Sequence, residues 1–285
     1  MSIQIGTVVK FQETMTRRVL RGIVAKCHDD QVDIKTQDGR VHTRLAARVK
    51  PVRGTMSVSD VKARFKYLRQ IVAMVANNHT ASAIISGPGG LGKTHSVTET
   101  LHTLGYTEGR DYHLVKGFTS PRALYETLHD NNGLLTVFDD CDSALDKHIS
   151  ASMLKGALDT APVRRINWLV KQNAKNSLYP LGFNFNGRVI FVTNKLVHEL
   201  DGPLRTRSMV IDFQMTRSEI LDWMEHSLPD FKGYHMAEKK VAMAFIRRVS
   251  PDIRELSLRT LVMVLKIMRA HPADWMDLAA HTITQ

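Results

Sequence analysis

The chain has 285 residues, of which 43% are hydrophobic, and its 39 Lys and Arg against 28 Asp and Glu give a formal net charge of +11. This length allows one large domain, or a medium and a small one, and the charge favours a polyanionic partner, with nucleic acid as the first candidate. Two cysteines exclude a disulfide framework and a cysteine zinc cluster, and we expect a reducing, cytoplasmic compartment. The sequence shows no signal-peptide pattern and no apolar run near the roughly 18 residues of a membrane span, so no membrane association is expected.

Residues 1–55 are predicted to form a small basic β domain, because they hold eleven Lys and Arg against five Asp and Glu, a net charge of +6. Short alternating runs between turn signals, such as Asp38-Gly39, predict a compact SH3-like β-barrel. The five expected strands cover residues 7–11, 19–26, 31–36, 40–45 and 48–52. The candidate contacts to DNA or a docked protein include Arg17, Arg18 and Arg21. A solvated basic face explains the same charges equally well.

Residues 56–80 are predicted to form a linker helix with one apolar face, because Val61, Phe65, Leu68 and Val72 keep a spacing of three to four residues. We expect this helix to pack on an α/β nucleotide-binding domain at residues 81–214.

A phosphate-binding loop is predicted directly after a short apolar strand at residues 83–86. Residues 87–94 match G-x-x-x-x-G-K-[ST] at every fixed position. Glycines let backbone N–H groups curl around phosphates, Lys93 reaches the β- and γ-phosphates, and the Thr94 hydroxyl binds Mg²⁺. A helix that starts near Thr94 directs its positive end at the anion. The expected nucleotide-binding residues are Gly87, Pro88, Gly89, Gly90, Leu91, Gly92, Lys93, Thr94 and His95.

Two carboxylates follow a second apolar strand at residues 134–140, after an expected helix at 94–104, a strand at 112–116 and a helix at 121–129. Asp139 is predicted to hold Mg²⁺, and Asp140 to orient and polarise the attacking water. The adjacent Cys141 has no evident histidine partner, so we interpret it as a small buried residue rather than a nucleophile.

Residues 161–187 are predicted to form an inserted β-hairpin, after a helix at 146–160, because two alternating segments flank a polar tip. Arg164, Arg165, Trp168 and Lys171 are candidate contacts to nucleic acid or polypeptide. For Trp168, packing at a subunit boundary is the favoured alternative.

The strand predicted at residues 188–194 ends in Asn194, whose amide is placed to touch the γ-phosphate or the attacking water. Another strand is expected at 209–213. Residues 215–285 are predicted to form a helical lid with helices at 218–227, 237–249 and 252–269, and the last of these carries Arg254 and Arg259.

Taken together, these motifs resemble the AAA+ ATPases over residues 60–270. The resemblance rests on residues 87–94, on Asp139 and Asp140, and on Asn194 as the polar sensor. It implies a five-stranded parallel sheet with helices on both faces, a helical lid, and a ring or spiral, usually a hexamer, with ATP and Mg²⁺ bound between neighbouring subunits.

The resemblance also implies two arginine roles. Arg207, with Arg205 as the alternative, corresponds to an arginine that acts on the ATP of a neighbouring subunit. Arg259 is favoured over Arg254 as the lid arginine.

Segments such as Phe138-Asp-Asp-Cys-Asp-Ser143 and Phe191-Val-Thr-Asn194 look like a group of bacteriophage AAA+ proteins. Most AAA+ enzymes carry Glu where this chain has Asp140, which implies slower or more tightly gated hydrolysis.

Three functions are consistent with the sequence. The leading hypothesis is an ATP-driven, DNA-associated motor or loader in phage replication or recombination. The alternatives are a protein-remodelling ATPase, whose hairpin grips polypeptide, and a nucleotide-controlled scaffold with slow turnover.

Overall fold

The computed structural model describes residues 8–12, 19–28, 30–36, 40–51, 58–146, 148–169 and 178–284. Contacts divide the chain into two compact units, Met1–Ser57 and Val58–Gln285. Three predicted contact residues, Arg17, Arg18 and Lys171, lie outside the described residues, as does the side chain of Arg21.

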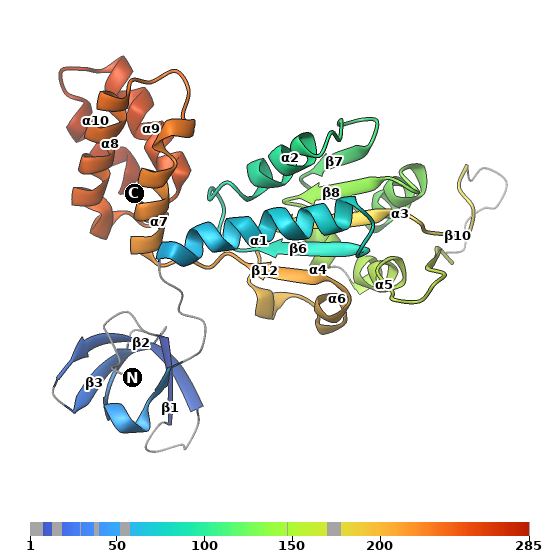
Figure 1. The fold of residues 1–285 in the computed structure, drawn as a ribbon, viewed down its shortest axis with the longest axis horizontal. Helices are drawn as coiled ribbons and strands as arrows, with labels where there is room; N and C mark the ends of the chain where they lie inside the picture. Colours follow the sequence, from blue (N-terminus) through green and yellow to red (C-terminus); the bar gives the residue numbers. More distant parts are fainter. Residues whose placement is uncertain are drawn as a thin grey trace. The chain divides into compact units, whose positions relative to one another are not determined.

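The first unit holds an antiparallel sheet in the order β4-β3-β2-β1-β5. Its strands are β1 (Val8–Gln12), β2 (Val19–Cys27), β3 (Gln31–Lys35), β4 (Val41–Leu45) and β5 (Lys50–Pro51), as Figure 1 shows. Alternate apolar residues such as Val9, Phe11, Val32 and Ile34 are buried, as expected for strands with one face on a core. Closure of this sheet into an SH3-like barrel stays a prediction.

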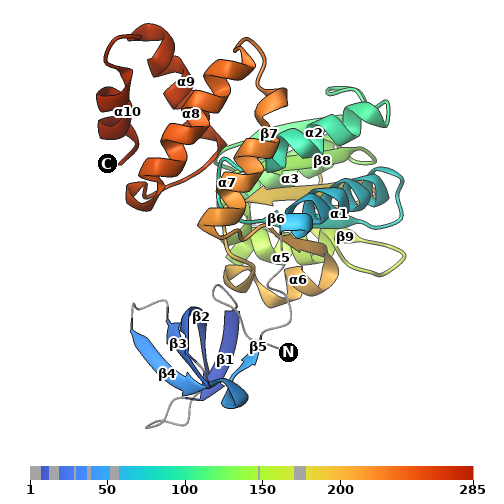
Figure 2. The same ribbon diagram turned by 60° about the vertical axis from the view of Figure 1, so that its left-hand side comes forward.

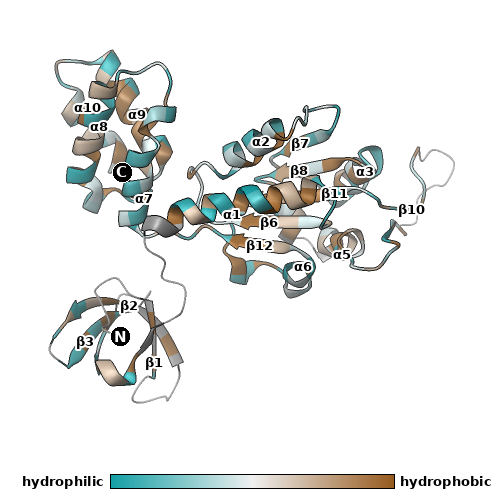
Figure 3. Cartoon of the chain, viewed as in Figure 1, coloured by the Kyte–Doolittle hydropathy of each residue, from teal (hydrophilic) through white to brown (hydrophobic). Residues whose placement is uncertain are grey.

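The second unit contains the predicted five-stranded parallel sheet, in the order β12-β6-β11-β8-β7. The strands are β6 (Ser82–Ser86), β7 (Tyr112–Lys116), β8 (Leu135–Asp139), β11 (Arg188–Thr193) and β12 (Met209–Asp212). β6 and β8 are buried throughout, and Figure 3 shows the sheet coloured mostly hydrophobic. Thr193 pairs with Ser86 and Val192 with Asp139, so the carboxyl ends of the three central strands meet at one edge.

Helices cover both faces of this sheet, as Figures 1 and 2 show. The helices α1 (Val58–Ala76) and α2 (Lys93–Thr103) pack on one face around Ile85 and Ile190. The other face buries Ile84, Phe138 and Phe191. It is covered by α3 (Pro121–Asp130), α4 (Asp142–Asp146), α5 (His148–Ala157) and α6 (Gly202–Arg207).

The segment predicted as one helix at 146–160 therefore differs from the structure, which has α4 and α5 in succession. The earlier start follows from a tertiary contact that local periodicity does not report. The Ser143 hydroxyl of α4 accepts a hydrogen bond from the Thr119 N–H at 2.9 Å and donates to the Thr119 carbonyl at 3.0 Å, which ties α4 to the loop after β7.

The insertion contains two antiparallel strands, β9 (Arg165–Asn167) and β10 (Gly182–Asn184), with Ile166 opposite Phe183. Its predicted polar tip, residues 171–177, lies outside the described residues.

Four helices pack around a separate apolar core to form the lid. They are α7 (Arg217–His226), α8 (Met236–Val249), α9 (Leu258–Ala270) and α10 (Trp275–Ile283). The predicted start of the third lid helix at residue 252 is wrong, because Ile253 is extended and Ser257 caps α9. The prediction also missed α10, a nine-residue helix that is stabilised by burial of Trp275, Ala279 and Ile283 rather than by propensity.

No helix in the described ranges is both long enough and apolar enough to span a membrane.

Candidate nucleotide-binding site

The phosphate loop connects β6 to α2 at the carboxyl edge of the sheet. Gly87, Gly90 and Gly92 have φ values of 139°, 73° and 90°, which L side chains rarely adopt. At Gly87 a Cβ atom would lie only 2.8 Å from Cβ of Phe213, so the close approach of these segments also requires glycine. The Gly87 N–H donates to the Thr193 carbonyl at 3.2 Å, which ties the loop to β11.

Lys93, at the start of α2, places its ammonium inside the loop. Nζ donates to the carbonyls of Gly87 at 2.5 Å and Pro88 at 2.7 Å, and to Oδ1 of Asn194 at 3.3 Å. Burial lowers the pKa of Lys93 to about 8, although the nearby Asp140 and Asp139 carboxylates oppose this shift. Lys93 is therefore still mostly protonated at neutral pH and can bind an anion.

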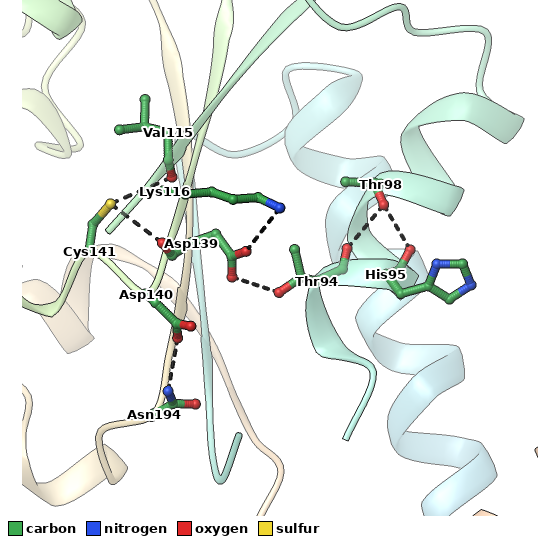
Figure 4. A network of polar contacts seen from close by, with 9 residues as sticks. All are labelled: Thr94, His95, Thr98, Val115, Lys116, Asp139, Asp140, Cys141 and Asn194. Carbon is green, nitrogen blue, oxygen red and sulfur yellow. Dashed lines mark hydrogen bonds and ion pairs between the residues drawn. The ribbon is translucent and has the colours of Figure 1, made fainter. Parts of the chain in front are cut away.

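Asp139 ends β8 and faces the hydroxyl that follows Lys93. Thr94 Oγ1 donates to Asp139 Oδ1 at 2.6 Å, as Figure 4 shows. Both are hard oxygen donors, the type that Mg²⁺ prefers. The described residues contain no group of three or more His, Cys, Asp or Glu able to hold a metal. Mg²⁺ at this site would therefore need nucleotide oxygens and water besides Thr94 and Asp139.

Asp140 follows in a left-handed conformation with φ of 54°. Its N–H donates to the Val192 carbonyl at 3.0 Å, and its carboxylate accepts a hydrogen bond from Asn194 Nδ2 at 2.9 Å. Non-glycine residues rarely adopt this conformation, although Asn and Asp tolerate it best. The turn directs the Asp140 carboxylate toward Asn194, whose amide oxygen also accepts a hydrogen bond from Lys93, so one side chain connects the candidate base to the lysine of the loop.

The lid and the loop share a cavity of about 1,100 Å³. Leu258 N–H donates to the Gly90 carbonyl at 3.0 Å, and Trp223 Nε1 donates to the Leu91 carbonyl at 3.3 Å. Arg259 and Lys266 of α9 line the cavity, as do Phe65 and Arg69 of α1 and, from the predicted set, residues 89–95 with Asp140 and Asn194.

Arg254 is not among the residues that line this cavity. It is exposed in the segment before α9, so the two lid arginines do not share a helix as predicted. The difference arises because the short 3₁₀ helix η4 (Ser250–Asp252) and the extended Ile253 precede α9, so the predicted helix does not begin at residue 252.

Arg205 and Arg207 lie on α6, away from the phosphate loop. Arg207 Nη1 donates to the Pro203 carbonyl at 3.2 Å, and Nε lies 3.9 Å from Asp159 Oδ2. Arg205 is exposed, and among the described residues its side chain forms no hydrogen bond or ion pair. Both arginines border a shallow surface hollow together with Gly202, Pro203 and Thr206.

The predicted hairpin contacts separate into buried and exposed side chains. Arg164 was predicted to contact a partner, but it is engaged within the chain. Its guanidinium donates to the carbonyls of Ala157 and Gly187 and lies over the Phe185 ring. Trp168 is partly buried against Tyr125, with ring centroids 5.9 Å apart. Arg165 is exposed.

Cys141 is buried, and burial raises the pKa of its thiol, in agreement with the predicted structural role. A residue that the sequence analysis missed is Lys116 of β7, whose Nζ lies 4.0 Å from Asp139 Oδ2. The order of the strands reveals this contact, because β7 lies beside β8 and Lys116 pairs with Asp139.

No family model matches the chain. An uncharacterized 36.7 kDa protein from the nrdC-mobD intergenic region of Enterobacteria phage T4 is 28% identical over 253 residues, which cover 78% of this chain and 75% of that protein.

Among solved structures, a variant of RuvB from Thermotoga maritima is similar with a TM-score of 0.48 and 16% identity, over 80% of this chain and 70% of that one. A chain of the E. coli MS115-1 HORMA:CdnC:Trip13 complex gives a TM-score of 0.41 and 13% identity, over 80% and 91%.

Proposed function

We propose that the chain is a Mg²⁺-dependent ATPase of the AAA+ type. The carrying observation is the set of side-chain contacts at the ends of three central strands. Thr94 contacts Asp139, and Asn194 connects Lys93 to Asp140. Ligands of open α/β sheets bind outside the carboxyl ends of the strands, where these groups lie.

Nucleotide binding follows from the loop and the helix that it precedes. The backbone N–H groups of residues 89–94 and the positive end of α2 attract phosphate oxygens, and the Lys93 ammonium adds a full charge. Thr94 and Asp139 would hold Mg²⁺, which neutralises phosphate charge when it is bound with the nucleotide.

Hydrolysis is assigned to Asp140 and Asn194. The Asp140 carboxylate accepts a proton from water while the water oxygen attacks the terminal phosphorus. The bond between that phosphorus and the bridging oxygen breaks, which leaves ADP and phosphate. Asn194 positions the Asp140 carboxylate through its Nδ2 group.

The direct test is phosphate release from ATP with Mg²⁺ and with excess chelator. We expect Mg²⁺-dependent turnover in the wild type. A purified chain that neither binds nor hydrolyses ATP would overturn the proposal.

From the AAA+ assignment we further propose that the subunits form a ring or spiral. In it, Arg207 of one subunit would contact the ATP that is bound to the neighbouring subunit. The Arg207 guanidinium would have to leave Asp159, whereas the exposed Arg205 would not. Arg207→Ala and Lys93→Ala chains, each nearly inactive, should regain part of the activity when mixed. A mixture that stays inactive while mixed rings form excludes Arg207 and directs the same test to Arg205.

We further propose a DNA-associated motor or loader role in replication or recombination, supported by the +6 charge of residues 1–55. Lys26, Lys35, Arg40 and Arg48 of that unit are exposed. A chain that starts at residue 58 should then bind DNA more weakly and with a shallower salt dependence. Equal binding by both chains would assign the first unit to protein docking.

An exposed apolar surface on the hairpin favours the second candidate, a protein-remodelling ATPase. Leu169, Leu178 and Leu181 have exposed fractions of 79%, 95% and 57%, which suits polypeptide better than a phosphate backbone. Turnover measured with single-stranded DNA, duplex DNA or unfolded protein separates the two, because only the true substrate class should stimulate it. Slow turnover that no addition stimulates would favour a nucleotide-controlled scaffold.

A further inference from the structure

Lys116 occupies a place beside the candidate metal ligand that the proposed mechanism leaves unused. It is the last residue of β7 and stands in register with Asp139 of β8. The two Asp139 oxygens face different partners. Oδ1 accepts from Thr94, and Oδ2 lies 4.0 Å from Lys116 Nζ. Figure 4 shows the Lys116 side chain extended toward Asp139.

The backbone that carries Lys116 is held firmly. The Gly117 N–H donates to the Asp139 carbonyl at 3.1 Å. The backbone N–H and carbonyl of Thr119 both form hydrogen bonds with the Ser143 hydroxyl. The side chain itself is 65% exposed, whereas that of Asp139 is 12% exposed. The ammonium thus has a fixed origin and a flexible stem long enough to change partners.

Stability does not account for this arrangement. Exposed ion pairs contribute little to stability, and an Asp139 oxygen occupied by Lys116 competes with the metal role assigned to that carboxylate. A Lys116 ammonium that leaves the Asp139 carboxylate for another anion is consistent with both the weak ion pair and the metal role of Asp139.

The position of β7 indicates which anion this is. The sheet order places β6 and its phosphate loop on one side of β8 and β7 on the other. Lys93 therefore lies on the loop side of Asp139, and Lys116 lies on its far side, next to the carboxylate to which the proposed function assigns the Mg²⁺ of the bound nucleotide.

We propose that Lys116 is a second phosphate-binding cation of this site, which moves from Asp139 to the terminal phosphate of the bound nucleotide. This proposal rests on the nucleotide-binding function proposed above. It gives the site a charge within the subunit that distinguishes a triphosphate from a diphosphate.

The test compares Lys116→Ala, Lys116→Arg and Arg122→Ala in the full chain. Arg122 is a matched control, because it is an exposed cation (55%) paired at 2.8 Å with a different acid, Glu126, rather than with Asp139. Fluorescent ATP and ADP analogues are titrated with and without Mg²⁺, so that the readout is binding rather than turnover.

We expect Lys116→Ala to weaken ATP binding about tenfold, the low end for a hydrogen bond to a charged group, and ADP binding much less. Lys116→Arg should restore most of the ATP affinity, and Arg122→Ala should match the wild type. Unchanged or tighter ATP binding by Lys116→Ala, with or without Mg²⁺, would overturn the proposal and leave Lys116 as a competitor for Asp139. Equal losses for ATP and ADP would also overturn it. Failure of the wild type to bind nucleotide would instead overturn the proposed function.

Discussion

The phosphate loop and the lid contribute to one cavity, but they are built differently. The loop places Lys93 at 5% exposure among carbonyls that lie five and six residues away in the sequence. The lid arginine, Arg259, is exposed, and α7 and α9 of the lid are held to the loop by contacts between residues more than 130 positions apart.

α1 holds the same junction from outside the loop. The Phe65 ring stacks on Trp223 with centroids 4.0 Å apart, and Arg64 pairs with Glu219 of α7 at 3.3 Å, with both side chains 11% exposed. The position of Lys93 within the loop is therefore determined largely by local contacts, whereas the groups of the lid depend on docking. Changes in the loop should therefore abolish function, and changes in the lid should reduce it.

The largest effect is expected for Asp140→Asn. Asparagine tolerates the left-handed backbone at this position, so the substitution removes the base and preserves the turn. Turnover should fall about 10³-fold, within the range for a general base, while ATP and Mg²⁺ binding persist. Asp140→Glu should keep measurable turnover. Phosphate release by Asp140→Asn at the wild-type rate would show that Asp140 is not the polarising group.

Lys93→Ala should weaken ATP binding by about 10²-fold or more, because the phosphates lose a buried charged donor. Isothermal titration with ATP measures the loss. Lys62→Ala, which removes an exposed lysine of α1 outside the cavity, is the control and should bind normally. Equal affinities for the two variants would refute the assignment of the phosphate loop.

Arg254 and Arg259 of the lid should differ in their effect, because of these two only Arg259 lines the cavity. Arg259→Ala should lower ATP affinity or turnover about tenfold, as expected for one charge-assisted contact from an exposed side chain. Arg254→Ala should match the wild type in both measurements. The reverse pattern would mean that the wrong lid arginine has been assigned.

Gly90→Ala tests the docking of the lid. A Cβ at Gly90 would lie 2.8 Å from Ser257 Cβ and Oγ, whereas at Gly105, with φ of 84°, it would meet nothing within 4 Å. Both substitutions strain a left-handed backbone by about 1 kcal/mol, so Gly105→Ala isolates that cost. We expect Gly90→Ala to lose about twice as much free energy of unfolding and also some ATP affinity. Identical losses in the two variants would indicate that the lid does not rest on Gly90.

The smallest effect is the pH dependence of binding. Burial lowers the pKa of Lys93 to about 8, so the free protein loses its ammonium as pH rises through that value. Phosphates require the protonated form, and ATP affinity should therefore fall about fourfold between pH 7 and 8.5 and stay nearly level below pH 7. Affinity that rises over this interval would contradict the role of the Lys93 ammonium.

Local signals in the sequence were sufficient to predict which strands and which loop form much of the candidate nucleotide site. Apolar runs predicted the strands of the parallel sheet, and glycine spacing placed Lys93 and Thr94 at its edge. Asp139 ends β8 and Asn194 directly follows β11, and all parallel strands direct their carboxyl ends to one edge, so strand type alone predicted that both residues lie at that edge.

Only the tertiary structure decided which distant segments meet. Arg164 is half-buried because carbonyls from two other segments accept its hydrogen bonds, and α10 forms because the lid core covers Trp275. Lys116 reaches Asp139 because β7 lies beside β8, an order that no local pattern encodes. Periodicity and turn chemistry act over a few residues, whereas strand order and helix docking depend on burial summed over the whole unit.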